Sequence, residues 1–361
     1  MLLLAVLFLA AEVPDQLLQR AISEHQKGEL PAAIRDYRAY LKARPGSPGV
    51  LSNLGAALAK TGDYAAAIED YTRALEKAEN PQVRLNLALA LYKTAQIGRA
   101  AEEIEKVMAV QPGNQQALLL LADCYLREGE NKKVIELLTH FQGARADDLS
   151  VPYLLGTALI RDNQVGRGQV IIERILKQGD TAEARLLLGM TKMQGNDYAG
   201  AREDLAKAVE LNPQLPDVYS YYGLALVTTG DTAQAAEAFR HELQTNPNDY
   251  GANLQLGALA RQEQKFDEAR AYFKRALLVR PGDAAVRYQL ATIELAEGAE
   301  EKAAKDLEEL VKESPNFTEA HVSLATVYYR LKRKTEGDRE RATVLRLNAE
   351  AQAKQPGVHV K

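Results

Sequence analysis

Apolar residues recur along the chain with the period of amphipathic helices, and the polar positions between them fall into turns. The pairs Leu54-Gly55, Leu188-Gly189 and Leu256-Gly257 open the same pattern. Seven residues after each glycine comes a turn, followed by an alanine and then, four residues further on, by an aromatic residue or leucine. Each pattern predicts two short helices that pack against each other through small side chains.

This two-helix pattern is an internal repeat of 34 residues, with two intervals of 33. The eighth position of every repeat is Gly or Ala, which allows the second helix of the repeat to approach the first closely. Alanine at the twentieth position has the same effect from the other side. The ten repeats begin near Pro14, Pro48, Pro81, Gln115, Leu149, Ala182, Pro216, Tyr250, Ala284 and Thr318.

Turn residues mark the ends of the predicted helices. Gly62 and Gly230 can end a first helix in the left-handed conformation. Asp63 and Asp231 can then cap the helix that follows. Proline closes six of the second helices, since it cannot continue a helix; these residues are Pro45, Pro112, Pro213, Pro247, Pro281 and Pro315.

In these positions the chain resembles the tetratricopeptide repeat family from about residue 14 to residue 345. The family's frequent tryptophan at the fourth position is absent, and residues such as Leu51, Leu118 and Tyr219 replace it. The resemblance implies an all-α, right-handed superhelical solenoid of about ten helix pairs. It also implies an inner surface, lined by the first helices, that binds peptides or protein segments.

The two ends of the chain depart from the repeat, which occupies residues 14–331. Residues 332–354 are much more charged than any earlier second helix, and we expect a C-terminal capping helix there because a terminal repeat exposes its outer face. Residues 355–361 are expected to fray. Within the array the repeats at 115–181 are irregular, with Val134 and Gly168 in place of the usual alanine. A hinge near residues 142–170 and simple repeat drift explain this equally well.

The first eleven residues, MLLLAVLFLAA, match the apolar core of a signal peptide. They are too few to span a bilayer, which takes about 20 residues. No Lys or Arg precedes them, and Leu9 stands where a small residue usually precedes the cleavage site. We expect a bacterial exported protein, periplasmic or secreted; the alternative is a cytoplasmic protein with a stray apolar start.

Composition and motifs indicate neither an enzyme nor a metal-binding or nucleic-acid-binding protein. The net charge of −4 gives no basic excess for nucleic acid. Cys124 is the only cysteine, so an internal disulfide and a cysteine-based metal cage are excluded, and a buried apolar role is expected for it. None of the five histidines falls at metal-ligand spacing, and no nucleophile or phosphate-loop motif is present. We therefore expect no catalytic residue, no metal site and no cofactor.

The residues expected on the inner face of the solenoid predict a binding groove. Positions 2, 5, 6, 9, 12 and 13 of a first helix share one face, and position 13 is basic in four consecutive repeats. Only Arg127 has an acid, Asp123, four residues earlier. Amides at position 6 can hold a peptide backbone. The candidate groove residues are Asn53, Lys60, Asn86, Lys93, Arg127 and Arg161, with an acidic or C-terminal carboxylate segment as the partner.

Apolar residues on the same face form a second candidate contact surface, unless neighbouring helices cover them: Leu85, Leu89, Tyr92, Leu119, Leu126, Tyr153, Ile160, Leu186, Met190 and Met193. Together these patterns favour a protein-interaction scaffold or adaptor in the bacterial cell envelope. The alternatives are a non-catalytic accessory subunit of an enzyme complex and a structural spacer. Neither the partner nor the oligomeric state follows from the sequence.

Overall fold

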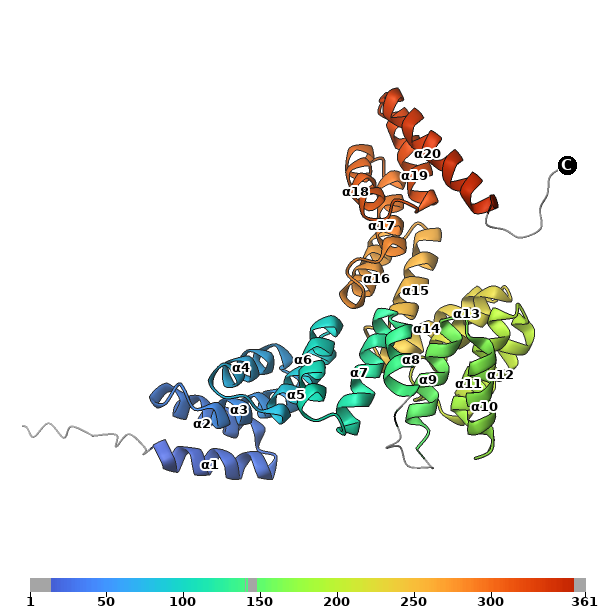
Figure 1. Ribbon diagram of the computed structural model, residues 1–361. Coiled ribbons are helices and arrows are strands. Elements are labelled where there is room, and N and C mark those ends of the chain that lie inside the picture. Colours follow the sequence, from blue (N-terminus) through green and yellow to red (C-terminus); the bar gives the residue numbers. More distant parts are fainter. Residues whose placement is uncertain (1–13, 140, 142–147, 354–361) are drawn as a thin grey trace, which may run out of the picture. The chain divides into compact units, whose positions relative to one another are not determined.

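The computed structural model describes residues 14–139, 141 and 148–353 of the 361. The signal-peptide-like segment, the C-terminal tail and residues 142–147 of the segment considered as a possible hinge lie outside the described residues. The described chain forms twenty α-helices and no strand (Figure 1), so the predicted all-α array of helix pairs is confirmed. The chain divides into two compact bodies, an N-terminal body, Met1–Glu173, and a C-terminal body, Arg174–Lys361.

In the N-terminal body the first nine helices pack in succession, each on its neighbour along the chain. The helices are α1 (Pro14–Lys27), α2 (Leu30–Ala43), α3 (Pro48–Lys60), α4 (Tyr64–Lys77), α5 (Pro81–Lys93), α6 (Ile97–Val110), α7 (Gln115–Glu128), α8 (Asn131–Thr139) and α9 (Ser150–Arg161). Helix α10 (Val165–Leu176) contains the boundary between the two bodies.

The C-terminal body continues the same succession of contacts. Its helices are α11 (Ala182–Gln194), α12 (Tyr198–Leu211), α13 (Val218–Thr228), α14 (Thr232–Thr245), α15 (Tyr250–Gln262), α16 (Phe266–Val279), α17 (Ala284–Ala296), α18 (Glu300–Glu313), α19 (Thr318–Arg330) and α20 (Lys334–Ala353).

Polar turns separate the two helices of each repeat as predicted. Asp63 accepts a hydrogen bond from the Ala66 amide at 3.2 Å and thereby caps α4. Gly62 has a φ of 85°, and the equivalent residue is left-handed in every repeat. These ten residues, five of which are not glycine, are Gly28, Gly62, Ala95, Gly129, Asn163, Asn196, Gly230, Gln264, Gly298 and Lys332.

Small residues at position 8 let the second helix press against the first. A Cβ added to Gly189 would lie 2.5 Å from Cγ of Leu205, and one added to Gly257 would lie 2.6 Å from the ring of Phe273. The alanines at position 20 are fully buried. The core of each repeat is therefore a contact between a small residue on one helix and a large apolar residue on its partner.

We expect Gly189→Ala to lower the free energy of unfolding by about 1–3 kcal/mol, because the new methyl group overlaps Leu205. Gly166→Ala in α10 is the matched control: a Cβ there meets no heavy atom within 4 Å, so alanine should stabilise the helix by about 0.5 kcal/mol. Urea denaturation followed by circular dichroism compares the two variants. Equal changes in the free energy of unfolding would show that the close approach at position 8 does not affect stability.

Candidate functional site

Four of the predicted groove residues lie on two first helices of the N-terminal body. Asn53 and Lys60 belong to α3, and Asn86 and Lys93 belong to α5. Both lysines are exposed in the last turn of their helix, where the helix dipole favours a cation. Both asparagines are half-buried, and Asn86 Oδ1 accepts a hydrogen bond from Gln82 Nε2 at 3.2 Å. The lysine ammonium groups are accessible to an anion in solution.

The other two cations are held by contacts within the protein. Arg127 Nε donates to Asp123 Oδ2 at 2.9 Å, and its guanidinium lies 5.0 Å from the centre of the Tyr92 ring. The Tyr92 hydroxyl donates to the same carboxylate. Arg161 Nη1 donates to the carbonyl oxygen of Leu126 at 3.3 Å. These contacts join α5, α7 and α9 across the positions predicted to share the inner face.

The structure thus modifies the expected row of four equivalent cations. Lys60 and Lys93 are exposed, whereas Arg127 and Arg161 are half-buried and bonded. The pair between Asp123 and Arg127 follows from their spacing of four residues. The contact of Arg161 does not, because it depends on how closely α9 approaches α7.

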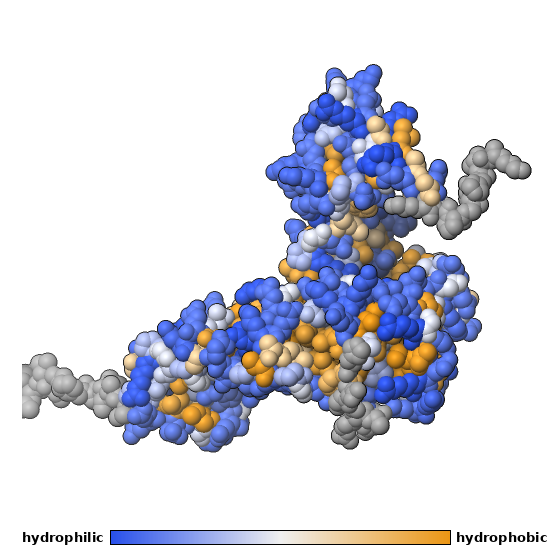
Figure 2. Space-filling view, viewed as in Figure 1, coloured by the Kyte–Doolittle hydropathy of each residue, from blue (hydrophilic) through white to orange (hydrophobic). Residues whose placement is uncertain are grey.

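The expected exposed apolar row is wrong for six of its ten residues. Side chains at these positions pack within the helix array, where each helix contacts neighbours on both sides. The visible face of the molecule is mostly hydrophilic, with apolar side chains in separate patches (Figure 2). The six buried residues are Leu85, Leu126, Tyr153, Ile160, Leu186 and Met190; Leu89, Tyr92, Leu119 and Met193 are half-buried.

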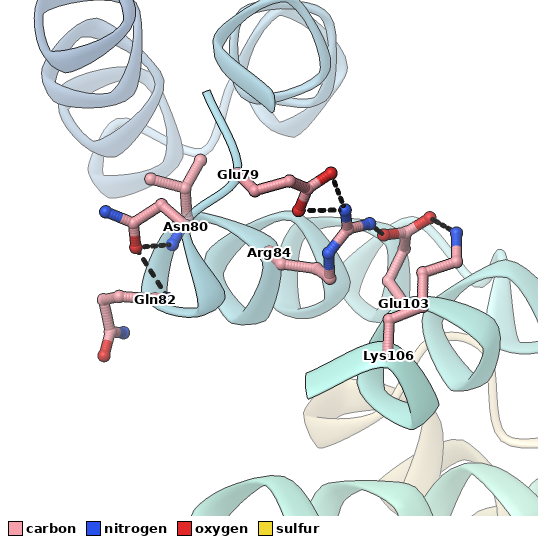
Figure 3. Close-up of polar contacts among 7 residues, drawn as sticks. Glu79, Asn80, Gln82, Arg84, Glu103 and Lys106 are labelled. Carbon is pink, nitrogen blue, oxygen red and sulfur yellow. Dashed lines mark hydrogen bonds and ion pairs between the residues drawn. The ribbon is translucent and has the colours of Figure 1, made fainter. Parts of the chain in front are cut away.

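An arginine occupies the fourth position of the third repeat, where the resembling family often has tryptophan. Arg84 Nη2 donates to both oxygens of Glu79, at 2.6 and 2.5 Å, and Nη1 donates to Glu103 on α6 (Figure 3). Lys106 also bonds Glu103, at 2.7 Å. Burial alone would raise the pKa of Glu103, but the hydrogen bonds from Lys106 and Arg84 hold it below its ordinary value. The cluster ties a first helix to its second helix.

The same arrangement recurs in the C-terminal body. Arg185 on α11 donates to Asp180 at 2.6 Å and to Asp204 on α12 at 2.7 Å. All three residues lie 101 positions after Arg84, Glu79 and Glu103. Our reading of the sequence missed this pair of clusters, although the equal offsets of one base and two acids were visible in it.

Three carboxylates meet at the start of α13. Oxygen atoms of Asp217, Glu242 and Asp249 lie within 4.8 Å of one another. Glu242 accepts hydrogen bonds from the amides of Asp217 and Tyr219, both at 3.2 Å, and so caps α13 from the neighbouring α14. Burial raises the pKa of Glu242 to about 8, and the charges of Asp249 and Asp217 contribute to the rise. The carboxyl group therefore carries a proton through most of the neutral range.

The cysteine and one of the histidines considered in the sequence have structural contacts. Cys124 is buried in α7, as expected, and burial raises the pKa of its thiol. His321 on α19 is enclosed by acceptors, with Nδ1 facing Glu340 of α20 and Nε2 facing the Pro315 carbonyl oxygen at 3.0 Å. The contact with Glu340 joins α19 to α20, and the contact with Pro315 joins α19 to the connection that precedes it. Across the described residues, no helix has the length and apolar character needed to cross a bilayer.

Comparison with known families matches the tetratricopeptide repeat model to residues 18–83, 85–138, 153–216, 186–250, 223–284 and 254–316. Among solved structures, yeast Tom70 aligns over 93% of this chain and 76% of its own, with a TM-score of 0.43 and 19% identity. MamA aligns over 46% of this chain and 98% of its own, with a TM-score of 0.41 and 20% identity.

Curated relatives are distant and longer. The human protein O-mannosyl-transferase TMTC1 is 23% identical over 68% of this chain and 24% of its own length. The peroxisomal targeting signal receptor of Saccharomyces cerevisiae is 24% identical over 68% of this chain and 36% of its own. Cellulose synthase 2 operon protein C of Komagataeibacter xylinus is 26% identical over 91% of this chain and 27% of its own. The chain thus spans about a quarter to a third of these relatives.

Proposed function

Because the chain belongs to the tetratricopeptide repeat family, we propose that it is a protein-binding scaffold whose N-terminal body holds an acidic segment of a partner, or its C-terminal carboxylate, along the inner face. The observation that carries this proposal is the pair of exposed lysines, Lys60 and Lys93, at equivalent positions of consecutive first helices. Asn53 and Asn86, seven residues earlier on the same helices, offer both a donor and an acceptor to a peptide backbone.

The charge of the inner face supports an anionic partner. Its positions on α3, α5, α7 and α9 carry Lys60, Lys93, Arg127 and Arg161, with Asp123 as the one acid. This excess of three positive charges occurs in a chain whose net charge is −4. A carboxylate-bearing segment would relieve the repulsion among the cations, which is screened over about 8–10 Å.

We expect Lys60→Glu together with Lys93→Glu to weaken binding of a hexaglutamate peptide at least about tenfold at low salt, because attraction becomes repulsion at two sites. Wild-type affinity should fall as salt rises. Lys42→Glu with Lys77→Glu is the matched control, since these exposed lysines end second helices. Isothermal titration calorimetry gives the affinities, and an amidated peptide separates an acidic side-chain ligand from a terminal carboxylate.

The outcome against the proposal is a Lys60/Lys93 double variant that binds hexaglutamate as the wild type does, with the same salt dependence. Arg161 is left unchanged in this test. It bonds the backbone of α7, so its removal would alter packing as well as charge.

We further propose that the protein is exported and works in the bacterial cell envelope. The support is the apolar segment of residues 1–11. Cell fractionation with mass spectrometry of the mature N-terminus tests this location. A chain starting near Ala11 or Glu12 in the periplasm supports export, and an intact Met1 in a cytosolic pool contradicts it.

A second candidate function is that of a non-catalytic accessory subunit of an enzyme complex. It is favoured by the match, over 91% of this chain, to a protein of a cellulose synthase operon. If the endogenous protein co-purifies with an enzyme and the Lys60/Lys93 double variant does not, the inner face is the surface that binds the enzyme complex. If the double variant still co-purifies with the enzyme, the protein binds the enzyme complex through another surface.

A further inference from the structure

Asp123 is the acid that interrupts the basic inner face of the N-terminal body. It lies on α7 at position 9, between Tyr92 of α5 and Arg127 one turn further along α7. Its carboxylate accepts from both side chains, and 28% of the side chain is exposed. A carboxylate bound beside Arg127 would therefore approach Asp123 closely.

The position of Asp123 has two electrostatic consequences for an anionic ligand. The carboxylate takes up the Nε donor of Arg127 and neutralises part of its charge, so the guanidinium offers less to an incoming anion. It also repels that anion directly, at a distance where charges on a protein surface still interact. The ligand and Asp123 thus compete for the same cation.

A purely structural role for Asp123 would involve its hydrogen bonds and not its charge. Burial raises the pKa of the Tyr92 phenol, and the neighbouring Asp123 raises it further, so this hydroxyl keeps its proton and donates. An asparagine side-chain oxygen can accept from both Tyr92 and Arg127 as the carboxylate does. Asp123→Asn therefore removes the charge while it preserves the contacts between α5 and α7.

We infer that Asp123 is a built-in competitor that limits the affinity of the inner face for acidic segments. It sets a threshold: a partner must bring enough negative charge to outweigh an internal carboxylate. A segment with a single carboxylate is therefore bound more weakly than a cluster of acids. This inference rests on the proposed function, since it concerns the same ligand and the same face.

The test measures hexaglutamate binding by calorimetry to the full-length wild type and Asp123→Asn. We expect the variant to bind roughly two- to fivefold more tightly at low salt, with a steeper loss of affinity as salt rises. Glu102→Gln is the charge-matched control, because Glu102 is exposed on the second helix α6. Tyr92→Phe removes a hydrogen bond to Asp123 without changing its charge. Neither variant should gain affinity.

The outcomes distinguish this inference from the proposed function. If the wild type binds hexaglutamate and Asp123→Asn binds it equally or more weakly, with the helix content unchanged, Asp123 is a structural residue and the inference is overturned. If Glu102→Gln or Tyr92→Phe gains as much as Asp123→Asn, it is also overturned. If neither the wild type nor Asp123→Asn binds, the proposed function itself fails.

Discussion

Raising the pH from about 5 to 8 is expected to destabilise the C-terminal body around α13 and α14, and Glu242→Gln is expected to remove most of that loss. The pKa of Glu242 lies near 8 in the fold and near 4.5 when the chain is unfolded. Below 4.5 both states hold the proton. Between these values only the unfolded state releases it, so stability falls as the pH rises. The upper limit of this loss is about 5 kcal/mol.

Glutamine imitates the protonated carboxyl group, since it offers an acceptor to the α13 amides and a donor toward Asp217 or Asp249. Thermal unfolding of both proteins at several pH values gives the comparison. The difference between them cancels most contributions of other titrating groups. Parallel curves for the wild type and Glu242→Gln between pH 5 and 8 would mean that the carboxyl group is already ionised in the fold.

Arg84→Met is expected to cost about 2 kcal/mol of stability, because Glu103 would stay largely buried with only Lys106 as a partner. Adding Glu103→Leu creates an apolar pair and should recover most of the lost stability, since replacing both members of a buried ion pair is often neutral. Urea denaturation of the single and double variants measures both steps.

Arg346→Met provides the control for this prediction. Arg346 pairs with Glu350 within α20, and both side chains are about half exposed, at 56% and 49%. Such a pair contributes less than about 1 kcal/mol. A loss for Arg346→Met as large as that for Arg84→Met would mean that burial does not decide the strength of the Arg84 cluster.

The repeat pattern predicts the parts of this structure that depend on neighbouring positions in the chain. Position 8, the left-handed Gly62 and the Asp63 cap are all local features, because a helix and its turn are specified within a few residues. The Asp123–Arg127 pair belongs to the same class, since residues four apart on a helix always lie on one face.

The features that the sequence does not predict depend on contacts between helices. The sequence predicts Arg161 to be a cation of the binding groove, and only the approach of α9 to α7 brings the Leu126 carbonyl within its reach. No sequence pattern marks Glu242, and its burial results from the amides of Asp217 and Tyr219 at the start of α13, which donate to it. Burial of such a group follows from packing, which periodicity alone does not define.

The contact between position 8 and its large partner also constrains how such an array can grow by duplication. Gly257 lies against the ring of Phe273, whereas Ala291 of the next repeat shares a core cluster with the smaller Leu307. A recombination event that joined the first helix of one repeat to the second helix of the other would set an alanine against phenylalanine. Crossovers that keep both helices of a repeat together avoid that clash. For these two repeats, an exchange of whole helix pairs therefore preserves the matched contact, whereas an exchange of single helices does not.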